Sequence, residues 1–326
     1  MITKTGRTSD MELQFLGTGA GMPSKQRNTS ALVVKLLQER GTFWLFDCGE
    51  ATQHQILHTT IKPRKLEKIF ITHMHGDHIF GLPGLLGSRS FLDGKEPLTI
   101  YGPVGIKEWI LTTLRLSRTY LQYRVDFVEI EEGIIFEDDQ FRVEAKLLEH
   151  VIPSFGYRVI QKPLPPQLLI EEAVKRGVPK GPLLAKLKNG QDVVLENGET
   201  VYSKDVTADA SKGFSLSILG DTRFCQASIE LSRDVDIVIH EATFDAGTEE
   251  LAKPYGHSTI TQAALVAKES QAKHLIVQHI SARFMPNQSE ELRIQGLSVF
   301  PSITVAADFA EYELKQGELI EINKGS

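Results

Sequence analysis

The chain has 326 residues, of which 41% are hydrophobic and 24% charged, with 36 Lys and Arg against 42 Asp and Glu. That apolar fraction excludes a disordered chain, and no apolar run approaches the ~18–20 residues that cross a bilayer. Two cysteines exclude a disulfide framework, and the polar residues 1–10 exclude a signal peptide. We therefore expect a cytoplasmic protein without a membrane segment, whose net charge of −6 by itself argues against nucleic-acid binding.

The first half of the chain alternates between strand and helix patterns. Residues 1–10 read as a leader or an added extension, because Met11 directly precedes the first clear strand, and residues 11–326 then form the main domain. Short apolar runs bounded by turn residues predict further strands. The strands are expected at 13–17, 31–36, 43–46, 68–71 and 98–101, and helices at 50–59 and 104–117.

The second half repeats this alternation, so the fold class is α/β. Strands are expected at 143–148, 215–219, 237–240, 274–278 and 304–306. A helix is expected at 260–270, where Thr259 and Gln262 have the spacing of a capping box.

An unusual stretch, residues 161–200, separates the two halves. Its first thirty residues hold five prolines and six Lys and Arg against two Glu, and no aromatic residue occurs between Tyr157 and Tyr202. Such a segment is a poor core builder and is expected to project from the body. Two interpretations stay open, a loop without fixed structure or a basic arm that contacts a polyanion.

The strongest chemical signal is the run from Thr72 to His78, which follows the expected strand 68–71 directly. His73 and His75 alternate along an extended chain and can face one metal, while Asp77 and His78 follow a turn at Gly76 and can face another. Imidazole and carboxylate ligands suit zinc, with manganese or iron as alternatives.

Three more ligand candidates follow strands elsewhere, namely His150, Asp221 and His279. We expect His73, His75 and His150 to hold one metal, and Asp77, His78 and His279 the other. Asp221 can bridge the two because a carboxylate has two oxygens. Asp47 also ends a strand and is expected to orient a ligand histidine from behind.

Two adjacent metal ions favour hydrolysis, because water held between them loses a proton near neutral pH and becomes the nucleophile. The metals also neutralise charge on a phosphoryl oxygen. The ligand set thus predicts two bound metal ions, zinc before manganese or iron, and a hydrolase, with Asp77 among its catalytic residues.

The His-x-His-x-Asp-His run at 73–78 resembles the metallo-β-lactamase fold. Four further motifs resemble one branch of it, the bacterial short-form ribonuclease Z family of tRNA 3′-processing endonucleases. These are Pro23-Ser-Lys-Gln-Arg-Asn28, His240-Glu-Ala-Thr243, His257-Ser-Thr259 and Ala306-Ala-Asp-Phe309. The resemblance extends over nearly the whole chain from Met11.

This resemblance implies a four-layer αβ/βα sandwich with two zinc ions at one edge of its sheets. It implies an endoribonuclease that removes the 3′ trailer of precursor tRNA through a metal-bridged hydroxide. Cleavage after the discriminator base leaves a tRNA 3′-hydroxyl and a trailer 5′-phosphate. Glu241 and His257 would form the catalytic pair that hands a proton to the departing 3′-oxygen.

The resemblance also implies substrate contacts and a homodimer. Lys25, Arg27 and Asn28 lie on a loop that would touch the tRNA 3′ end, whereas solvated surface charge is the alternative for Lys25 and Arg27. The stretch 161–200 resembles a flexible tRNA-binding arm that presents tRNA to the partner's active site. Its candidate contacts are Lys175, Arg176, Lys180, Gly181, Pro182, Lys186 and Lys188.

Two other functions stay open. One is a different hydrolase on the same fold, such as a thioesterase, a sulfatase or an enzyme for small phosphodiesters. The other is a non-catalytic RNA-binding protein with structural zinc, although two ligand sets with an open bridging position exceed what a structural site needs.

Overall fold

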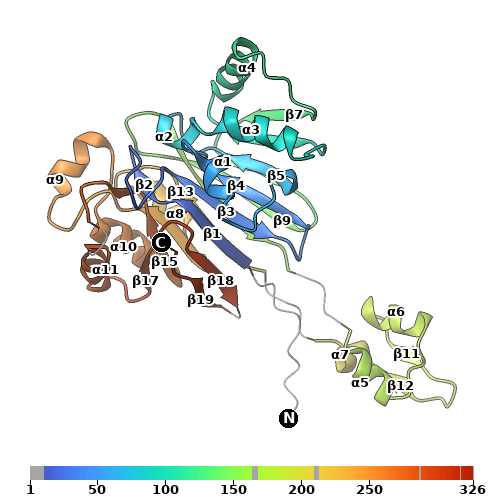
Figure 1. The fold of residues 1–326 in the computed structure, drawn as a ribbon. Coiled ribbons are helices and arrows are strands. Elements are labelled where there is room, and N and C mark those ends of the chain that lie inside the picture. The colour runs from blue at the N-terminus through green and yellow to red at the C-terminus, as the bar shows by residue number, and fades with distance from the viewer. Residues whose placement is uncertain (1–10, 164–167, 209–212, 286–287, 316, 326) are drawn as a thin grey trace.

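Two β-sheets pack face to face at the centre of the molecule, and helices cover their outer faces (Figure 1). This computed structural model describes residues 11–163, 168–208, 213–285, 288–315 and 317–325. The predicted extension at 1–10 lies outside these residues. In spatial order, the first sheet contains β19 (Glu318–Asn323), β18 (Glu311–Lys315), β1 (Met11–Gly17), β3 (Ala31–Leu36), β4 (Thr42–Phe46), β5 (Leu66–Phe70), β6 (Leu98–Gly102) and β7 (Val125–Glu129).

The second sheet has parallel strands in its middle and antiparallel strands at one side. In spatial order it contains β17 (Ile303–Val305), β15 (His274–Gln278), β14 (Ile237–Glu241), β13 (Ser215–Leu219), β10 (Ser154–Gln161), β9 (Phe141–Leu148) and β8 (Gly133–Glu137). A small parallel pair joins β2 (Gly19–Ala20) to β16 (Ile280–Ser281). This pair ties the first loop of the chain to the segment after β15.

Each layer follows from strand alternation, because successive side chains point to opposite faces of a sheet. In β3, Leu32, Val34 and Leu36 enter the core between the sheets, whereas Ala31 and Val33 face the helices. The helices on that side are α1 (Thr52–Ile56), α3 (Leu82–Phe91) and α4 (Ile106–Leu116).

The second sheet repeats the arrangement. Ile237 and Ile239 of β14 face the central core, and Val238 faces the outer helices. Those helices are α8 (Gln226–Leu231), α10 (Ile260–Glu269) and α11 (Ser289–Leu297). Helix, sheet, sheet and helix give the four layers that the resemblance implies, and the α/β class is confirmed.

Most predicted elements occur within a few residues of their expected bounds. Strands 31–36, 215–219 and 274–278 match, and Thr259 and Gln262 form the capping box at the start of α10. The helix expected at 50–59 is shorter because Ala51, directly before it, has a left-handed backbone with φ of 57°. Across the described part of the chain, no helix is long and apolar enough to cross a membrane.

The stretch between β10 and β13 forms a small unit that projects from the body (Figure 1). It contains α5 (Ile170–Lys175), α6 (Pro182–Lys188), β11 (Val193–Val194), β12 (Thr200–Val201) and α7 (Ser203–Val206). We call residues 168–207, which the bridge between Leu168 and Thr207 closes, the arm. Its described residues have a core of their own, so the sequence-based expectation of a poor core builder was wrong. The core residues are Ala173, Val178, Leu187, Val193, Leu195, Val201 and Val206.

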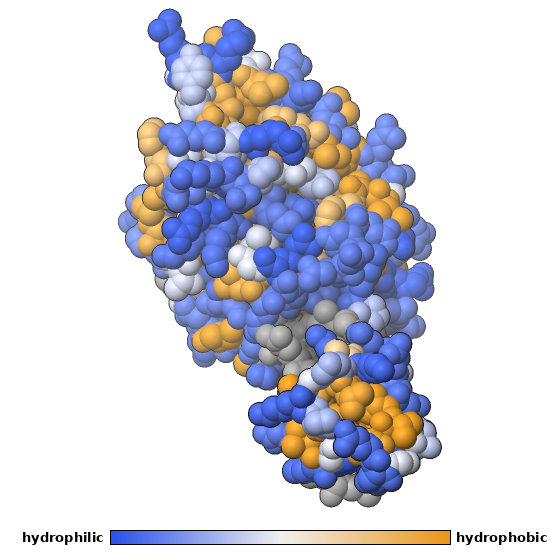
Figure 2. Space-filling model, turned by 90° about the vertical axis from the view of Figure 1, so that its right-hand side faces the viewer, coloured by the Kyte–Doolittle hydropathy of each residue, from blue (hydrophilic) through white to orange (hydrophobic). Residues whose placement is uncertain are grey.

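The charge balance of the arm also differs from the expectation. Lys and Arg number six in residues 168–207, and so do Asp and Glu, because the segment after residue 190 adds Asp192, Glu196, Glu199 and Asp205. The arm as a whole is therefore neutral. Figure 2 shows hydrophobic side chains gathered on it, at the bottom of the view.

The connections between strands place the candidate residues at one edge of the sandwich. Strands β4 and β5 are parallel in the first sheet, and β13, β14 and β15 are parallel in the second. The carboxyl ends of parallel strands meet at one edge, where loops carry functional groups. The residues at or after these strand ends, and after β9, are Asp47, the run 72–78, His150, Asp221, Glu241 and His279.

Far from that edge, the Glu67 carboxylate holds together the start of β5 and the turn before β4. It accepts hydrogen bonds from Arg40 at 2.8 and 3.0 Å, from Thr42 at 2.8 Å and from the Trp44 indole at 3.0 Å, and it pairs with Lys68 at 2.8 Å. Burial raises the pKa of the Glu67 carboxyl. The hydrogen bonds from Arg40, Lys68 and Trp44 outweigh burial and lower this pKa from 4.5 to about 2. The ionised carboxylate is therefore a stabilising group.

We expect Glu67→Gln to lower the free energy of unfolding at pH 7 by about 2–3 kcal/mol, since charged hydrogen bonds are lost. Because the folded pKa is depressed, this stabilisation is present above pH 4.5 and is lost as the pH falls toward 2. Chemical denaturation of chelator-treated protein across this range measures the effect, with the exposed Glu131→Gln as control. A pH-independent difference between Glu67→Gln and the parent would contradict this account.

Candidate metal centre and its surroundings

The loop after β5 carries all four residues of the run that could bind a metal. His73 and His75 lie in an extended segment, and α2 (Gly76–Ile79) then turns the chain at Asp77 and His78, with the His78 ring centroid 4.1 Å from that of His73. A side chain at Gly76 would meet the Phe80 ring at 2.2 Å, which explains the glycine at this turn. The run predicted from sequence therefore serves two neighbouring groups.

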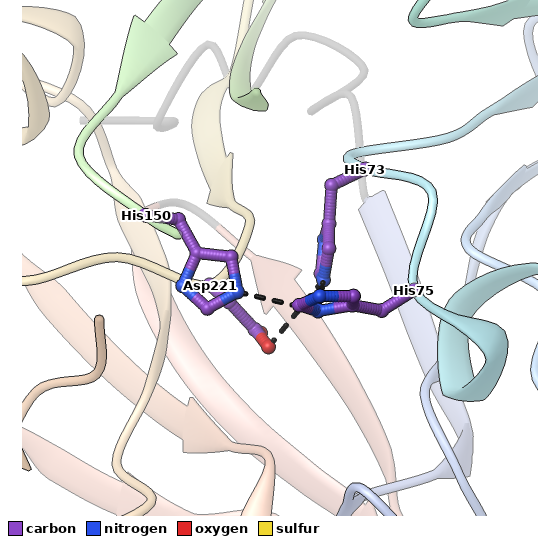
Figure 3. A group of neighbouring side chains, drawn as sticks. All are labelled: His73, His75, His150 and Asp221. Atoms are coloured by element: carbon purple, nitrogen blue, oxygen red, sulfur yellow. Dashed lines mark hydrogen bonds and ion pairs between the residues drawn. The ribbon is translucent and has the colours of Figure 1, made fainter. Parts of the chain in front are cut away.

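Four side chains converge in the first group, as Figure 3 shows. His73 Nε2 lies 3.1 Å from His75 Nδ1, and His150 Nε2 lies 3.3 Å from the same atom. Asp221 Oδ2 lies 3.6 Å from His73 Nε2. All four ligand atoms lie within 4.8 Å of one another.

The second group contains Asp77, His78 and His279. His279 Nε2 lies 3.2 Å from His78 Nε2 and 3.3 Å from Asp77 Oδ2. Asp221 Oδ2 reaches this group as well, at 3.6 Å from His78 Nε2 and 3.3 Å from His279 Nε2. The structure thus brings all seven predicted ligands together, with Asp221 between the two groups.

The donor set fits two zinc ions. Nitrogens about 2.0–2.1 Å from a tetrahedral zinc lie about 3.3–3.4 Å apart, close to the 3.1–3.3 Å nitrogen separations found here. Burial lowers the pKa of His73, His75 and His150, so these imidazoles are neutral and offer a lone pair. For His78, burial is outweighed by Asp221 and Asp47, which raise its pKa, so a cation binding there displaces a proton.

The second nitrogen of four of these histidines is held by a neighbour. His78 Nδ1 lies 2.8 Å from Asp47 Oδ2, and His150 Nδ1 lies 2.8 Å from the Gly256 carbonyl. His279 Nδ1 lies 3.0 Å from Thr243 Oγ1, and His73 Nδ1 lies 3.0 Å from Thr72 Oγ1. Such contacts fix the ring orientation and are typical of metal ligands.

Asp47 shows how much structure this positioning requires. Its oxygens also accept hydrogen bonds from the backbone N–H and the hydroxyl of Thr72, at 2.8 and 2.9 Å. Asp47 has a φ of 56° and His279 has a φ of 57°, a left-handed region that non-glycine residues adopt at a cost of about 1–3 kcal/mol. The surrounding hydrogen bonds hold both residues in place.

We expect Asp47→Asn to weaken metal binding about 10–100-fold, because the carboxylate that holds His78 is lost while the side-chain shape is kept. Titration of chelator-treated protein with zinc, read by isothermal calorimetry, measures this change. The exposed Asp139→Asn is the matched control. Unchanged zinc affinity in Asp47→Asn would contradict the positioning role.

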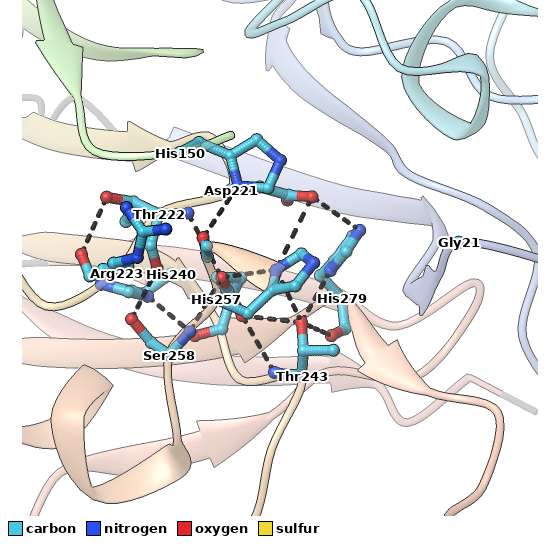
Figure 4. Close-up of polar contacts among 12 residues, drawn as sticks. Gly21, His150, Asp221, Thr222, Arg223, His240, Thr243, His257, Ser258 and His279 are labelled. Atoms are coloured by element: carbon cyan, nitrogen blue, oxygen red, sulfur yellow. Dashed lines mark hydrogen bonds and ion pairs between the residues drawn. The ribbon is translucent and has the colours of Figure 1, made fainter. Parts of the chain in front are cut away.

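Glu241 and His257, the predicted catalytic pair, are in contact beside the two groups of candidate metal ligands. His257 Nδ1 lies 2.9 Å from Glu241 Oε1 and 3.9 Å from Asp221 Oδ2, and Figure 4 shows its imidazole next to His279 and Thr243. Although burial opposes protonation, Glu241 raises the pKa of His257 to about 9. Bound cations would act against this rise.

Glu241 is fully enclosed at the end of β14 and cannot turn away. Its carboxylate accepts the backbone N–H groups of Thr222, Thr243 and Ser258 at 3.2, 3.0 and 3.0 Å, and the Thr243 hydroxyl at 2.7 Å. These bonds favour the ionised form of the carboxylate. Burial raises the pKa of Glu241, but the charge of His257 outweighs burial and lowers it. The carboxylate is thus a fixed anion behind His257.

Three contacts at the site were missed by reasoning from the sequence. The Gly21 N–H donates to Asp77 Oδ2 at 2.8 Å, the Gly256 carbonyl contacts His150, and the Thr243 hydroxyl contacts His279. Two of them use backbone groups, which carry no residue-type signal. Thr243 lies inside a motif that was noted, but nothing in the motif indicated its partner.

The loop 23–28 is placed beside this edge, but its residues differ in exposure. Lys25 is exposed. The Arg27 guanidinium donates to Thr18 Oγ1 and to the Ala306 carbonyl, both at 2.6 Å. The Asn28 amide nitrogen Nδ2 donates to the Glu50 carbonyl at 2.8 Å. Arg27 therefore has partners inside the protein. The sequence-based interpretations of Arg27, a substrate contact or a solvated surface charge, did not include this placement.

The arm candidates all lie on the surface of the arm, away from the metal groups (Figure 1). Arg176 lies 3.3 Å from Asp205 and 3.8 Å from Glu172, which offsets its charge. Gly181 has a φ of 147°, a conformation that favours glycine, and Pro182 begins α6. The exposed residues of the arm candidate set are Lys175, Arg176, Lys180, Gly181, Pro182, Lys186 and Lys188.

A cavity of about 260 Å³ opens onto the metal groups. Its lining includes the ligands His75, Asp77, Asp221 and His279 together with His257. A phosphoryl group entering it would meet the metal ligands on one side and His257 on another. Cations held by the two groups would polarise a phosphodiester there, and His257 is placed to protonate its leaving group.

Comparisons with known proteins agree with this chemistry. A family model described as anti-Pycsar protein Apyc1 matches residues 11–160, less than half of the chain. The ribonuclease Z of Geobacillus kaustophilus (strain HTA426) is 53% identical over 307 residues, which cover 94% of this chain and 100% of that protein. The ribonuclease Z of Anoxybacillus flavithermus is 52% identical over 304 residues, which cover 93% and 97%.

Solved structures show the same relationship. The short form of human tRNase Z matches with a TM-score of 0.65 and 32% identity, covering 92% of this chain and 98% of that chain. A metallo-β-lactamase fold protein of Bacillus subtilis has the same TM-score at 18% identity, covering 94% and 100%, and shows the fold alone. With 53% identity over 94% of its length, the chain belongs to the ribonuclease Z family.

Proposed function

We propose that this protein is a zinc-dependent endoribonuclease that removes the 3′ trailer from precursor tRNA. Cleavage after the discriminator base leaves a 3′-hydroxyl on the tRNA and a 5′-phosphate on the trailer. The observation that carries the proposal is the Glu241–His257 pair beside two ligand groups that share Asp221. Hydrolysis with a leaving-group acid needs both parts, and a structural metal site needs neither the pair nor the cavity.

The seven side chains would hold two zinc ions, one in each group. Bound zinc would supply Lewis-acid polarisation of a phosphoryl oxygen and would lower the pKa of the attacking water. Asp47, Thr243 and the Gly256 carbonyl orient the imidazoles from behind, so the ligand atoms do not need to rearrange when a cation arrives.

His257 serves as the acid for the departing 3′-oxygen. Its Nδ1 faces Glu241, so the proton to be donated sits on Nε2, the other ring nitrogen. The fixed charge of Glu241 favours the imidazolium form and sets the ring orientation. After the phosphorus–oxygen bond breaks, the leaving alkoxide takes this proton and becomes the 3′-hydroxyl.

The arm is proposed to bind the tRNA at a distance from the cleavage site, within a homodimer in which one subunit's arm presents tRNA to its partner. Support comes from its projection away from the metal groups and from its exposed Lys180, Lys186 and Lys188 (Figure 1). Contacts of this kind are made to phosphates, so they are salt-dependent and do not select bases. Exposed Lys25 is proposed to contact the tRNA 3′ end, and Arg27 and Asn28 to shape that loop from within.

Single-turnover cleavage of a 3′-extended precursor tRNA, with both product ends mapped, tests the proposal. We expect one cut after the discriminator base that chelation abolishes and zinc restores. Replacement of residues 168–207 by a short Gly-Ser linker should remove tRNA cleavage and retain hydrolysis of bis(p-nitrophenyl) phosphate, because the arm core shares no residue with the other three cores. Equal loss of both activities, or retention of both, would reject the role of the arm.

A small-phosphodiester hydrolase is the competing function. Metal-replete protein that hydrolyses small phosphodiesters and leaves precursor tRNA intact would establish this alternative.

A further inference from the structure

The cavity at the metal groups has an aromatic rim that the hydrolytic chemistry does not use. Phe244 and Tyr255 line the cavity together with Asp221 and His257. The Phe244 and Tyr255 rings lie 6.3 Å apart at 20°, nearly parallel. The Arg283 guanidinium lies over the Phe244 ring, 4.5 Å from its centroid. An aromatic pair with a cation is the surface that nucleobases stack on.

The rings of this rim continue toward the metal ligands. Phe244 lies 6.3 Å from His257 at 36°, and His257 lies 5.5 Å from His279 at 29°. Tyr255, Phe244, His257 and His279 therefore form a run of roughly parallel rings from the rim inward. Tyr255 itself lies two ring positions from His257, the group that protonates the leaving oxygen.

Tyr255 is exposed, yet its position is defined. Its side chain is 64% exposed, whereas Phe244 is 8% exposed, so Tyr255 offers the accessible face. Tyr255 ends the short helix η2 (Lys253–Tyr255), and Gly256 after it contacts His150 through its carbonyl. At the other end, Arg223 Nε donates to the Lys253 carbonyl at 2.7 Å.

Arg283 is held next to the Phe244 ring by contacts of its own. Its Nη2 donates to Asp245 Oδ1 at 2.9 Å, and its guanidinium also lies 4.7 Å from the Phe284 ring centroid. The side chain is 41% exposed and keeps donors for a phosphate near the cavity. A base on the rings and a phosphate beside Arg283 are the two parts of a nucleotide.

We propose that Tyr255, Phe244 and Arg283 form a stacking platform for the nucleobase next to the scissile phosphate. The platform positions that nucleotide for cleavage, and Tyr255 contacts the base directly. This inference rests on the proposed function, since it takes the substrate to be a single-stranded RNA end. Unpaired bases in RNA are commonly bound by such aromatic stacking.

Pairing protein variants with substrate variants tests the contact. Precursor tRNAs are made with an abasic nucleotide either at the discriminator position or at the first trailer position. Each is cleaved under single-turnover conditions by the parent, Tyr255→Phe, Tyr255→Leu and the control Tyr120→Ala, whose native side chain is 86% exposed. Zinc content is measured for every preparation.

On the intact substrate, Tyr255→Leu should lower kcat/KM about tenfold to a hundredfold. Tyr255→Phe, which keeps an aromatic ring, should lose less than Tyr255→Leu, and Tyr120→Ala should match the parent. For one of the two abasic substrates, kcat/KM of the parent enzyme should fall to the value that Tyr255→Leu shows on the intact substrate. Tyr255→Leu should lose little more on that abasic substrate, because base and ring belong to one contact.

If the rate losses from Tyr255→Leu and from base removal multiply for both abasic substrates, the platform is overturned, even if Tyr255→Leu cleaves the intact substrate slowly. An unimpaired Tyr255→Leu on the intact substrate would overturn it as well. Both results leave precursor tRNA cleavage by the parent in place, whereas failure of the proposed function shows as no cleavage of the intact precursor by the zinc-loaded parent.

Discussion

Replacing Asp221 by alanine is expected to remove zinc binding and phosphodiester cleavage together. Its Oδ2 lies 3.3–3.6 Å from ligand atoms of both groups, so neither group keeps its full donor set without it. The buried imidazoles left behind would also face one another without an anion between them. We expect cleavage to fall at least about 10³-fold, since metal polarisation contributes several kcal/mol.

Elemental analysis of the dialysed protein and single-turnover cleavage measure this loss together. The exposed Asp139→Ala is the matched control and should keep both zinc and activity. Circular dichroism separates loss of the site from loss of the fold, because Asp221 lies at the sheet edge and outside the three cores of the body. An Asp221→Ala protein with full zinc and near-normal cleavage would contradict the shared-carboxylate arrangement.

Replacing His257 by alanine is expected to slow cleavage by about 10²–10⁴-fold while the zinc content stays unchanged. His257 is 2.9 Å from Glu241 and, although it also lies near Asp221 and His279, both predicted ligand groups keep all their members when it is removed. Glu241→Gln should show a smaller loss, because the imidazole remains but its proton is less favoured.

A change of leaving group distinguishes an acid from a merely structural histidine. A precursor with sulfur in place of the bridging 3′-oxygen releases a thiolate, which needs no protonation at neutral pH. His257→Ala should therefore approach the rate of the parent on this substrate. An equal deficit on the oxygen and sulfur substrates would show that His257 acts through structure or binding instead.

Several features could be predicted from sequence because their signals are local. The run 72–78 places its ligands on one strand exit, and the alternation of apolar residues in β3 encodes the two faces of a sheet. The Thr259–Gln262 capping box spans only four residues. For such features neighbours in the chain are also the interacting partners, so residue type and spacing suffice.

The arm illustrates where local reasoning fails. Proline and lysine between 161 and 190 indicated a projecting basic segment, but the small core draws on residues up to Val206. Leu187 and Val193 are unremarkable singly and become buried only when α6 and β11 pack together. The acidic residues of the second part then cancel the charge of the first.

By itself, the sequence determined the α/β class, the seven side chains that gather in the two candidate ligand groups and their order along the strands. Only the tertiary structure decided that Arg27 is bound internally and that Tyr255 stands at the rim of the cavity. It also supplied the Gly21 N–H and the Gly256 carbonyl. These depend on distances between segments far apart in the chain and on backbone groups that every residue carries, so no pattern of residue types encodes them.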